Sequence, residues 1–184
     1  MQTRDFVLFT HGVFADQGIK GRTALQKIVY FLSVFTEEDM GYAPHFYGPY
    51  SSKVAAANSE LKELNFIKEY VSVYGYSSQG FEMMKYDYSL TDDGQKLLER
   101  KKKLFHGEWD RMSAIADKIK AAGDLGYMEL AMAAKAHIIL KREGGNANLA
   151  TIKNKAKQLG WSIDDGDLDN ALTFLEKIEL VSWH

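Results

Sequence analysis

The stretch Tyr47-Gly48-Pro49-Tyr50-Ser51-Ser52-Lys53-Val54 decides the fold, together with Leu-Lys-Glu-Leu-Asn-Phe-Ile at residues 61–67. A proline fixes its own backbone dihedral, so the Gly48-Pro49 pair predicts a rigid turn. Ser51 and Ser52 are of the residue type that caps helix N-termini. The stretch therefore predicts a turn, a helix over 52–64 and a strand that follows directly.

The predicted helix has two distinct sides. At 100° per residue one side collects Val54, Ala57, Leu61 and Leu64, which we expect to face the core. The opposite, outward side presents Ser52, Ala55, Ala56, Ser59, Lys62 and Glu63.

Two helices are expected before the turn and two strands after it. Residues 5–16 carry an apolar set compatible with a first amphipathic helix. Thr23 and Gln26 fit a capping box at the start of the second helix. Residues 67–74 and 81–90 read as strands joined by a loop over 75–80. On the returning strand one face collects Met84, Tyr86, Tyr88 and Leu90.

Three helices followed by a hairpin are the geometry of a winged helix-turn-helix. We therefore predict a mainly α protein with a small β-hairpin, divided into a winged-helix domain over 1–95 and a C-terminal helical domain over 96–184. The second domain is expected to hold helices over 95–120, interrupted near His106-Gly107, and over 125–140, 149–159 and 164–178, with a linker at 143–146. Residues 172–178 echo the spacing of 61–67 and lead into a strand-like tail, as in a degenerate helix-turn-helix.

Composition narrows the class of protein. The 184 residues include no cysteine, which excludes disulfides, thiolate metal sites and a cysteine nucleophile. The N-terminus has no secretory pattern, and no apolar run approaches the roughly 20 residues of a membrane span. We expect a cytoplasmic protein that does not contact the membrane.

Catalytic and metal-binding signatures are not visible. The five histidines have no metal-ligand spacing, and the acids at 164–169 lack the pattern of a calcium loop. No phosphate-binding loop, nucleophile elbow or zinc-protease motif is present. We therefore predict no enzyme, no metal and no cofactor.

Charge is close to balanced, at 23 Lys+Arg against 25 Asp+Glu. The positive segment is residues 101–145, with 9 basic and 6 acidic side chains, and it begins beside Arg100 with Lys101, Lys102 and Lys103. A dedicated nucleic-acid binder usually shows a stronger basic stripe.

The segment Leu25-Gln26-Lys27-Ile28-Val29-Tyr30-Phe31-Leu32, combined with Phe46-Tyr47-Gly48-Pro49-Tyr50-Ser51, resembles two related prokaryotic groups. One is the YwgA-like winged-helix family, and the other is the Panacea domain, the SocA-like antitoxin family. The resemblance is close over residues 20–67, and the second half of the chain favours the YwgA-like group. Panacea members neutralise toxins through protein contacts, so the resemblance implies a winged helix with an antitoxin-like alternative. Leu90-Thr91-Asp92-Asp93-Gly94 is similar to segments that end the wing in many winged-helix regulators.

The leading hypothesis is DNA binding of a transcription-regulator-like kind, in which the third helix enters the major groove and the wing meets the backbone. The candidate contacts are Ser52, Lys53, Ala56, Ser59, Lys62, Tyr76, Gln79, Lys101, Lys102 and Lys103, beside the turn motif Tyr47, Gly48, Pro49, Tyr50 and Ser51. Glu63 offsets Lys62, so few phosphates could be neutralised unless a homodimer doubled the contacts.

The alternative hypothesis is a protein-binding adaptor or antitoxin-like module that uses the same helix and turn. Small residues on the outward side of the third helix would let a partner helix approach closely. Aromatic anchors of the kind that interfaces favour are Tyr47, Tyr50, Tyr74, Tyr76 and Trp161.

Overall fold

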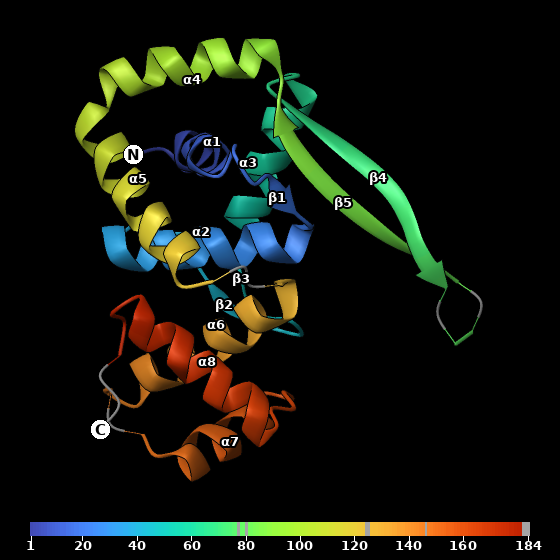
Figure 1. The fold of residues 1–184 in the computed structure, drawn as a ribbon, viewed down its shortest axis with the longest axis vertical. Helices are drawn as coiled ribbons and strands as arrows, with labels where there is room; N and C mark the ends of the chain where they lie inside the picture. Colours follow the sequence, from blue (N-terminus) through green and yellow to red (C-terminus); the bar gives the residue numbers. More distant parts are fainter. Residues whose placement is uncertain (77, 80, 124–125, 146, 182–184) are drawn as a thin grey trace.

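The structure, a computed structural model, describes residues 1–76, 78–79, 81–123, 126–145 and 147–181. Ser77 and Gly80 of the predicted loop, Leu125 at the start of a predicted helix and Asn146 of the predicted linker lie outside these ranges. The described chain is mainly helical with a small antiparallel sheet, as predicted (Figure 1). The elements in chain order are α1 (Thr3–Val13), β1 (Ile19–Lys20), α2 (Arg22–Thr36), β2 (Ala43–His45), β3 (Gly48–Tyr50), α3 (Ser52–Glu63), β4 (Ile67–Tyr76), β5 (Glu82–Leu90), α4 (Asp92–Leu104), α5 (His106–Ala121), α6 (Tyr127–Arg142), α7 (Leu149–Gln158) and α8 (Asp165–Lys177).

Helix α1 lies at the centre of the N-terminal half. Its residues Phe6 to Phe9 are fully buried, because α3, α4 and α5 all pack against it. Helix α5 also contacts α2, so the chain after residue 95 covers the same core. The predicted division of the chain at residue 95 is untested by this packing and stays a prediction.

The predicted third helix is confirmed as α3. Its N-cap is Ser51, whose hydroxyl accepts a hydrogen bond from the Val54 amide at 3.1 Å. The predicted inward residues Val54, Ala57 and Leu61 are buried. Leu64 was predicted wrongly, since it is 49% exposed. It is the C-cap of α3, and Asn65 follows in the left-handed conformation, so Ile67 takes the inward place instead.

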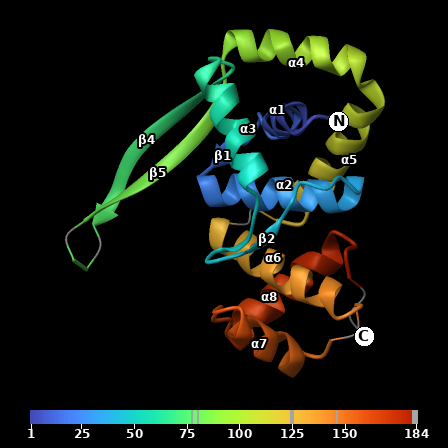
Figure 2. The ribbon, with the colours of Figure 1, turned by 180° about the vertical axis from the view of Figure 1, so that it is seen from behind.

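The sheet has the strand order β1-β5-β4. The long β4–β5 hairpin confirms the two predicted strands, and it projects away from the helices (Figure 2). The register pairs Val71 with Tyr86 and Val73 with Met84, so the predicted shared face of β5 is confirmed and extends across β4. Strands β1, β2 and β3 were not predicted, because two or three residues are too few to show a period. Strands β2 and β3 pair with each other in a separate two-stranded sheet.

Helices α6, α7 and α8 end the described chain; α6 contacts both α7 and α8, and it also contacts α2 and β3. Helices α7 and α8 begin at Asn148 and Asp164, whose side chains accept hydrogen bonds from the Thr151 and Asp167 amides. The acids near residue 164 therefore serve a helix start. The prediction of a strand-like tail after α8 was wrong for residues 179–181, which form no strand. In the described part of the chain no helix has the length and apolarity needed to cross a bilayer.

The segment Leu90-Thr91-Asp92-Asp93-Gly94 forms the junction of β5 and α4, and two of its residues have a clear structural role there. The Thr91 hydroxyl accepts a hydrogen bond from the Gly94 amide at 3.0 Å, which confirms the predicted cap, and donates one to the Asn65 carbonyl at 2.6 Å. Gly94 lies against the end of α3, where a Cβ would come within 1.8 Å of the Phe66 carbonyl oxygen. Only glycine leaves room for this contact, which joins the hairpin to the helices.

Replacing Gly94 with alanine should lower the free energy of unfolding by about 3 kcal/mol, since overpacking against backbone cannot be relieved by a rotamer change. Gly107→Ala is the control, because no atom lies within 4 Å of a Cβ at this helical position. There we expect a change of about 1 kcal/mol or less, in the stabilising direction. Urea denaturation of both variants makes the comparison, and equal effects would contradict the assigned contact.

Candidate functional site

The predicted turn at Gly48-Pro49 was misplaced, because the turn residues are Phe46 and Tyr47, and Gly48 and Pro49 lie in β3, which pairs with β2. We term residues 46–51 the turn.

Two polar residues of α2 hold this turn in place. Gln26 makes a two-way contact with Ser51, in which Nε2 donates to the Ser51 carbonyl and Oε1 accepts from the Ser51 amide, both at 3.0 Å. Lys27 donates from Nζ to the Pro49 carbonyl at 2.6 Å, and its side chain is 2% exposed. These three hydrogen bonds, which we term the clamp, connect the two segments that carry the family resemblance.

The clamp corrects the predicted capping box. Helix α2 begins at Arg22 with Gly21 as its N-cap, and no side chain caps it. Gln26 is therefore not bonded to Thr23 as predicted, because its amide group is fully engaged by Ser51. Gln26 and Lys27 lie on the side of α2 opposite the stripe of Leu25, Ile28, Val29 and Leu32. Tyr30 and Phe31 share that opposite side, and this was the signal that it is also buried and that its polar residues need partners.

The other side of the turn is held by the C-terminal half. Trp161 donates from Nε1 to the His45 carbonyl at 2.7 Å and is buried, so the prediction of Trp161 as an exposed anchor was wrong. Gly48 has φ 90°, and a Cβ there would lie 3.1 Å from Cγ of Lys135. The turn is thus fixed between α2 and α6.

Two lysine side chains are buried together beneath the turn. Burial, and secondly the positive charge of Lys135, lower the pKa of Lys27 to about 8. Burial also lowers the pKa of Lys135, while the charge of Asp167 raises it. Their amines favour the neutral form more than a surface lysine does.

A groove of about 350 Å³ opens between the turn and α3, close to the start of α2. We define it by Gln26, Tyr47, Tyr50, Ala55, Ser59 and Lys62. Four predicted site residues meet here, namely Tyr47, Tyr50, Ser59 and Lys62. The other predicted turn residues, Gly48, Pro49 and Ser51, are buried and serve the clamp.

The remaining predicted site residues lie elsewhere. Ser52, Lys53 and Ala56 are exposed on the outward side of α3, and Tyr76 and Gln79 lie at the far end of the hairpin. Residues 101–103 are on α4, which lies on the other side of α1 from α2 and the β2–β3 hairpin (Figure 1). The structure therefore does not bring all ten candidate contacts onto one surface.

Charges in the groove are already paired. Glu69 lies 3.3 Å from Nζ of Lys62 and 3.4 Å from Arg22, and it accepts a hydrogen bond from the Tyr88 hydroxyl at 3.0 Å. Partial burial of Glu69 opposes its charge, but the hydrogen bonds from Tyr88 and Lys62 lower its pKa overall. Burial and the Glu69 carboxylate raise the pKa of Tyr88 to about 12.

The basic run on α4 is also largely engaged within the protein. Lys101 pairs with the buried carboxylate of Asp5 at 2.9 Å. Lys102 pairs with Glu99 at 2.8 Å and lies 4.0 Å from the centre of the Trp109 ring. Among the described residues no three His, Asp or Glu side chains gather as a metal-ligand set.

The β4–β5 hairpin carries the largest exposed apolar surface. We term the described residues within 70–87 the arm. Of fifteen large apolar side chains exposed in the described chain, seven belong to it, namely Tyr70, Val71, Val73, Tyr74, Tyr76, Phe81 and Met84. Three more, Phe46, Tyr47 and Tyr50, lie on the β2–β3 turn. Exposed apolar patches of this kind mark interaction sites.

Replacing Gln26 with alanine should lower the free energy of unfolding by about 2–3 kcal/mol, because two buried backbone groups of Ser51 lose their partner. The control is Gln95→Ala, whose side chain bonds only the exposed Glu99 on α4. A surface change of this kind is expected to stay within about 0.5 kcal/mol. Thermal and urea unfolding measure both, and a Gln26→Ala effect as small as the control would contradict the clamp.

Replacing Lys135 with methionine should raise the pKa of Lys27, since it removes the neighbouring positive charge. Folding lowers the pKa of Lys27 from 10.5 to about 8, so the stability that this group contributes is present above pH 10.5 and lost as the pH falls through 8. The variant should flatten this dependence. NMR titration of the lysine side chains measures the pKa, with Lys141→Met on the exposed side of α6 as the control. An unchanged Lys27 pKa in Lys135→Met would refute the coupling.

No family model matches the chain. The chain is 30% identical over 176 residues to the uncharacterised protein YwgA of Bacillus subtilis (strain 168), and the match covers 92% of this chain and 93% of YwgA. The matched region includes both segments joined by the clamp. The chain therefore belongs to the YwgA family.

Proposed function

We propose that this chain is a winged-helix protein that binds another protein through its arm and the adjoining groove. The order α1-β1-α2-α3-β4-β5, with the sheet order β1-β5-β4, supports the winged-helix assignment and the relationship to the Panacea domain. In this assignment the arm is the wing, and α3 is the helix beside it.

The observation that carries the proposal is the face of the arm that continues the core. Near the body this face holds the buried Ile67 and Tyr88. Further out it holds Val71 opposite Tyr86 and Val73 opposite Met84, where Val71 is 50% and Val73 44% exposed. Glu69 interrupts this face, and the Arg22 guanidinium stacks on Tyr86 at 3.7 Å from the ring centre, so the uncovered apolar part is Val71, Val73 and Met84. Burial of these side chains by another chain would gain free energy.

The outer edge of the arm supports the same function. Strand β4 is the last in its sheet, so one row of its backbone N–H and C=O groups has no neighbour among the described strands. A partner can add a strand to this edge while its side chains cover the apolar row. We infer a partner that supplies one extended segment with alternating apolar residues.

The exposed face of α3 and the α4 lysines support duplex DNA less well. Lys62, Lys101 and Lys102 are each paired with a carboxylate, so binding phosphate would first cost an internal contact. Neutralised phosphates supply most of non-specific DNA affinity. A surface with few available cations therefore gains little binding free energy from phosphate neutralisation.

One observation keeps DNA as the second candidate. The first turn of α3 holds no acid, and Lys53 makes no ion pair among the described residues. A helix N-terminus of this kind is favourable for a phosphate group. Its role would be that of a transcription-regulator-like protein with Lys53 as a principal contact.

Site-specific photocrosslinking in the cells that make the protein tests the proposal. p-Benzoylphenylalanine at position 74, on the arm, should give one discrete protein adduct. The same probe at position 149, an exposed apolar position on α7, is the control and should give none. In a Val71→Ser, Val73→Ser background the adduct should fall at least about tenfold, because the apolar row is lost.

Equal adducts from both positions, no adduct from the arm, or an adduct indifferent to the serine changes would each overturn the proposal. An adduct of twice the mass of this chain would replace the distinct partner with a second copy.

Fluorescence anisotropy of a labelled duplex at about 50 and 200 mM salt tests the second candidate. We expect weak binding with a shallow salt dependence. Tight binding that falls steeply with salt and is abolished in Lys53→Glu, Lys62→Glu would make DNA the principal ligand.

A further inference from the structure

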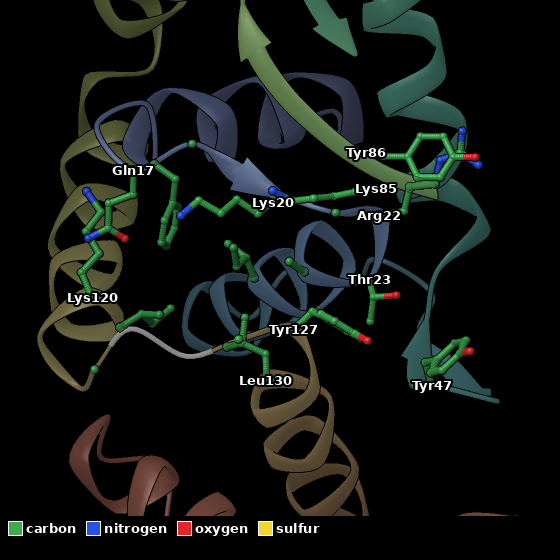
Figure 3. A pocket seen from close by; sticks show the side chains of 18 of the residues that line it. Gln17, Lys20, Arg22, Thr23, Tyr47, Lys85, Tyr86, Lys120, Tyr127 and Leu130 are labelled. Carbon is green, nitrogen blue, oxygen red and sulfur yellow. The ribbon is translucent and has the colours of Figure 1, made fainter. Parts of the chain in front are cut away.

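A second and larger cavity, of about 720 Å³, lies on the other side of the α2 N-terminus from the groove. Its walls come from the end of α1, β1, the start of α2, β5, the end of α5 and the start of α6 (Figure 3). The volume falls within the range of about 300–1,000 Å³ that is usual for small-molecule sites. Segments from both halves of the chain meet here, which is a common position for such sites.

Most of the wall is apolar or aromatic. Buried core side chains close the inner part, namely Phe14, Ile28, Ile119, Leu130 and Phe174. Tyrosine rings form the outer part, namely Tyr47, Tyr74, Tyr86 and Tyr127. Flat ring surfaces at the entrance of an apolar cavity favour a ligand that is itself planar, because aromatic rings bury large areas against one another.

The charged side chains of the wall share one sign. The described lining residues include Lys20, Arg22, Lys85 and Lys120 and no Asp or Glu. In Figure 3 Lys20 and Lys85 lie on the sheet side of the cavity, and Lys120 lies on the α5 side. Cations that converge on a partly apolar space without an acid in its described wall favour a negatively charged ligand group.

Lys20 differs from the other three cations in that no described acid pairs with it. Acids outside the lining pair with the other three, as Asp16 lies 2.8 Å from Lys120, Asp87 lies 3.0 Å from Lys85, and Glu69 lies 3.4 Å from Arg22. Lys20 makes no ion pair with any described residue. An anion beside Lys20 would therefore gain a charge-assisted contact without displacing a carboxylate.

We propose that this cavity binds a small organic anion, a planar ring system that carries one carboxylate, sulfonate or phosphate group. The ring lies among the tyrosines and the apolar inner wall. The anionic group lies toward Lys20, and Lys120 adds a second positive charge from the facing wall. The outer wall of this cavity shares Tyr74, Met84 and Tyr86 with the arm, so a partner that covers the arm would narrow the entrance. Lys20, Lys120 and the apolar inner wall lie outside the arm, so the binding of an anion does not require the proposed protein-binding function.

The test uses 8-anilinonaphthalene-1-sulfonate, an aromatic sulfonate whose fluorescence rises on transfer from water to an apolar site. We expect saturable binding of one molecule per chain. N-Phenyl-1-naphthylamine has the same rings without the sulfonate, and it should bind at least about tenfold more weakly, as expected for loss of a charge-assisted contact.

Charge variants locate the bound probe. Lys20→Met should weaken the sulfonate at least about tenfold and Lys20→Met, Lys120→Met further, while neither changes the affinity for the neutral amine. Lys157→Met, an exposed lysine on α7 away from the cavity, is the control and should change nothing. Circular dichroism and the melting temperature verify that the variants are folded.

Competition separates the two parts of the proposed ligand. Naphthalene-1-sulfonate should displace the probe, and inorganic phosphate at the same concentration should not. Displacement by inorganic phosphate would show that the site binds the anionic group without a ring, which contradicts the proposed ring system. Absent or multiple binding, equal affinity for the neutral amine, or indifference to both charge variants would overturn it.

Discussion

The clamp between α2 and the Gly-Pro turn is the interaction on which the rest of the structure depends. Gln26 fixes both backbone groups of Ser51, and Ser51 in turn caps α3. The direction in which α3 leaves the turn is therefore set by a side chain of α2. Lys27 adds a third contact through the Pro49 carbonyl, so the groove beside α3 has a rigid floor.

The clamp places two lysine ammonium groups in an apolar environment, which is costly unless they are bonded. Lys27 meets this cost with one carbonyl. Lys135 lies beside Gly48, where the Met132 sulfur, the Trp161 ring and the charge of Asp167 favour its ammonium group. The arrangement explains why a glycine occupies position 48, since its φ of 90° is strained for other residues and a Cβ would lie 3.1 Å from the Lys135 stem. Contacts with α2 and α6 thus hold this short turn in place.

Local signals in the sequence were sufficient for much of the fold. The position of α3, the Thr91 cap and the shared face of β5 rest on residues within a few positions of one another, and each was predicted correctly. Of the two candidate caps of α3, Ser51 is the one that the structure shows. Short-range rules decide such features because the partners are neighbours in the chain.

Features that depend on distant partners could not be read in this way. Gln26 fitted a local capping box, yet its partner is 25 residues away. Lys101 looked available for phosphate, but it neutralises Asp5, 96 residues earlier. Trp161 looked like an exposed anchor and instead bonds His45, 116 residues earlier. In each case a long-range contact took over a side chain that local reasoning had assigned to the surface or to its own helix.

Lys62 on α3 and Lys101 on α4 are paired within the protein, whereas the apolar side chains of the arm are exposed. Where the lysines are neutralised internally, association must draw on apolar burial and backbone pairing rather than on phosphate neutralisation. The arm supplies both of these, and it begins where Glu69 ties β4 to Lys62 and Arg22.

Amide hydrogen exchange at Ser51, followed by NMR, tests the central claim most directly. In the wild-type protein this amide should exchange as slowly as the buried amides of α2, because it is bonded to the buried Gln26 side chain. In Gln26→Ala it should exchange at least about tenfold faster relative to the α1 amides, which report any global loss of stability. A Ser51 amide that exchanges quickly in the wild type, or at an unchanged relative rate in the variant, would contradict the clamp.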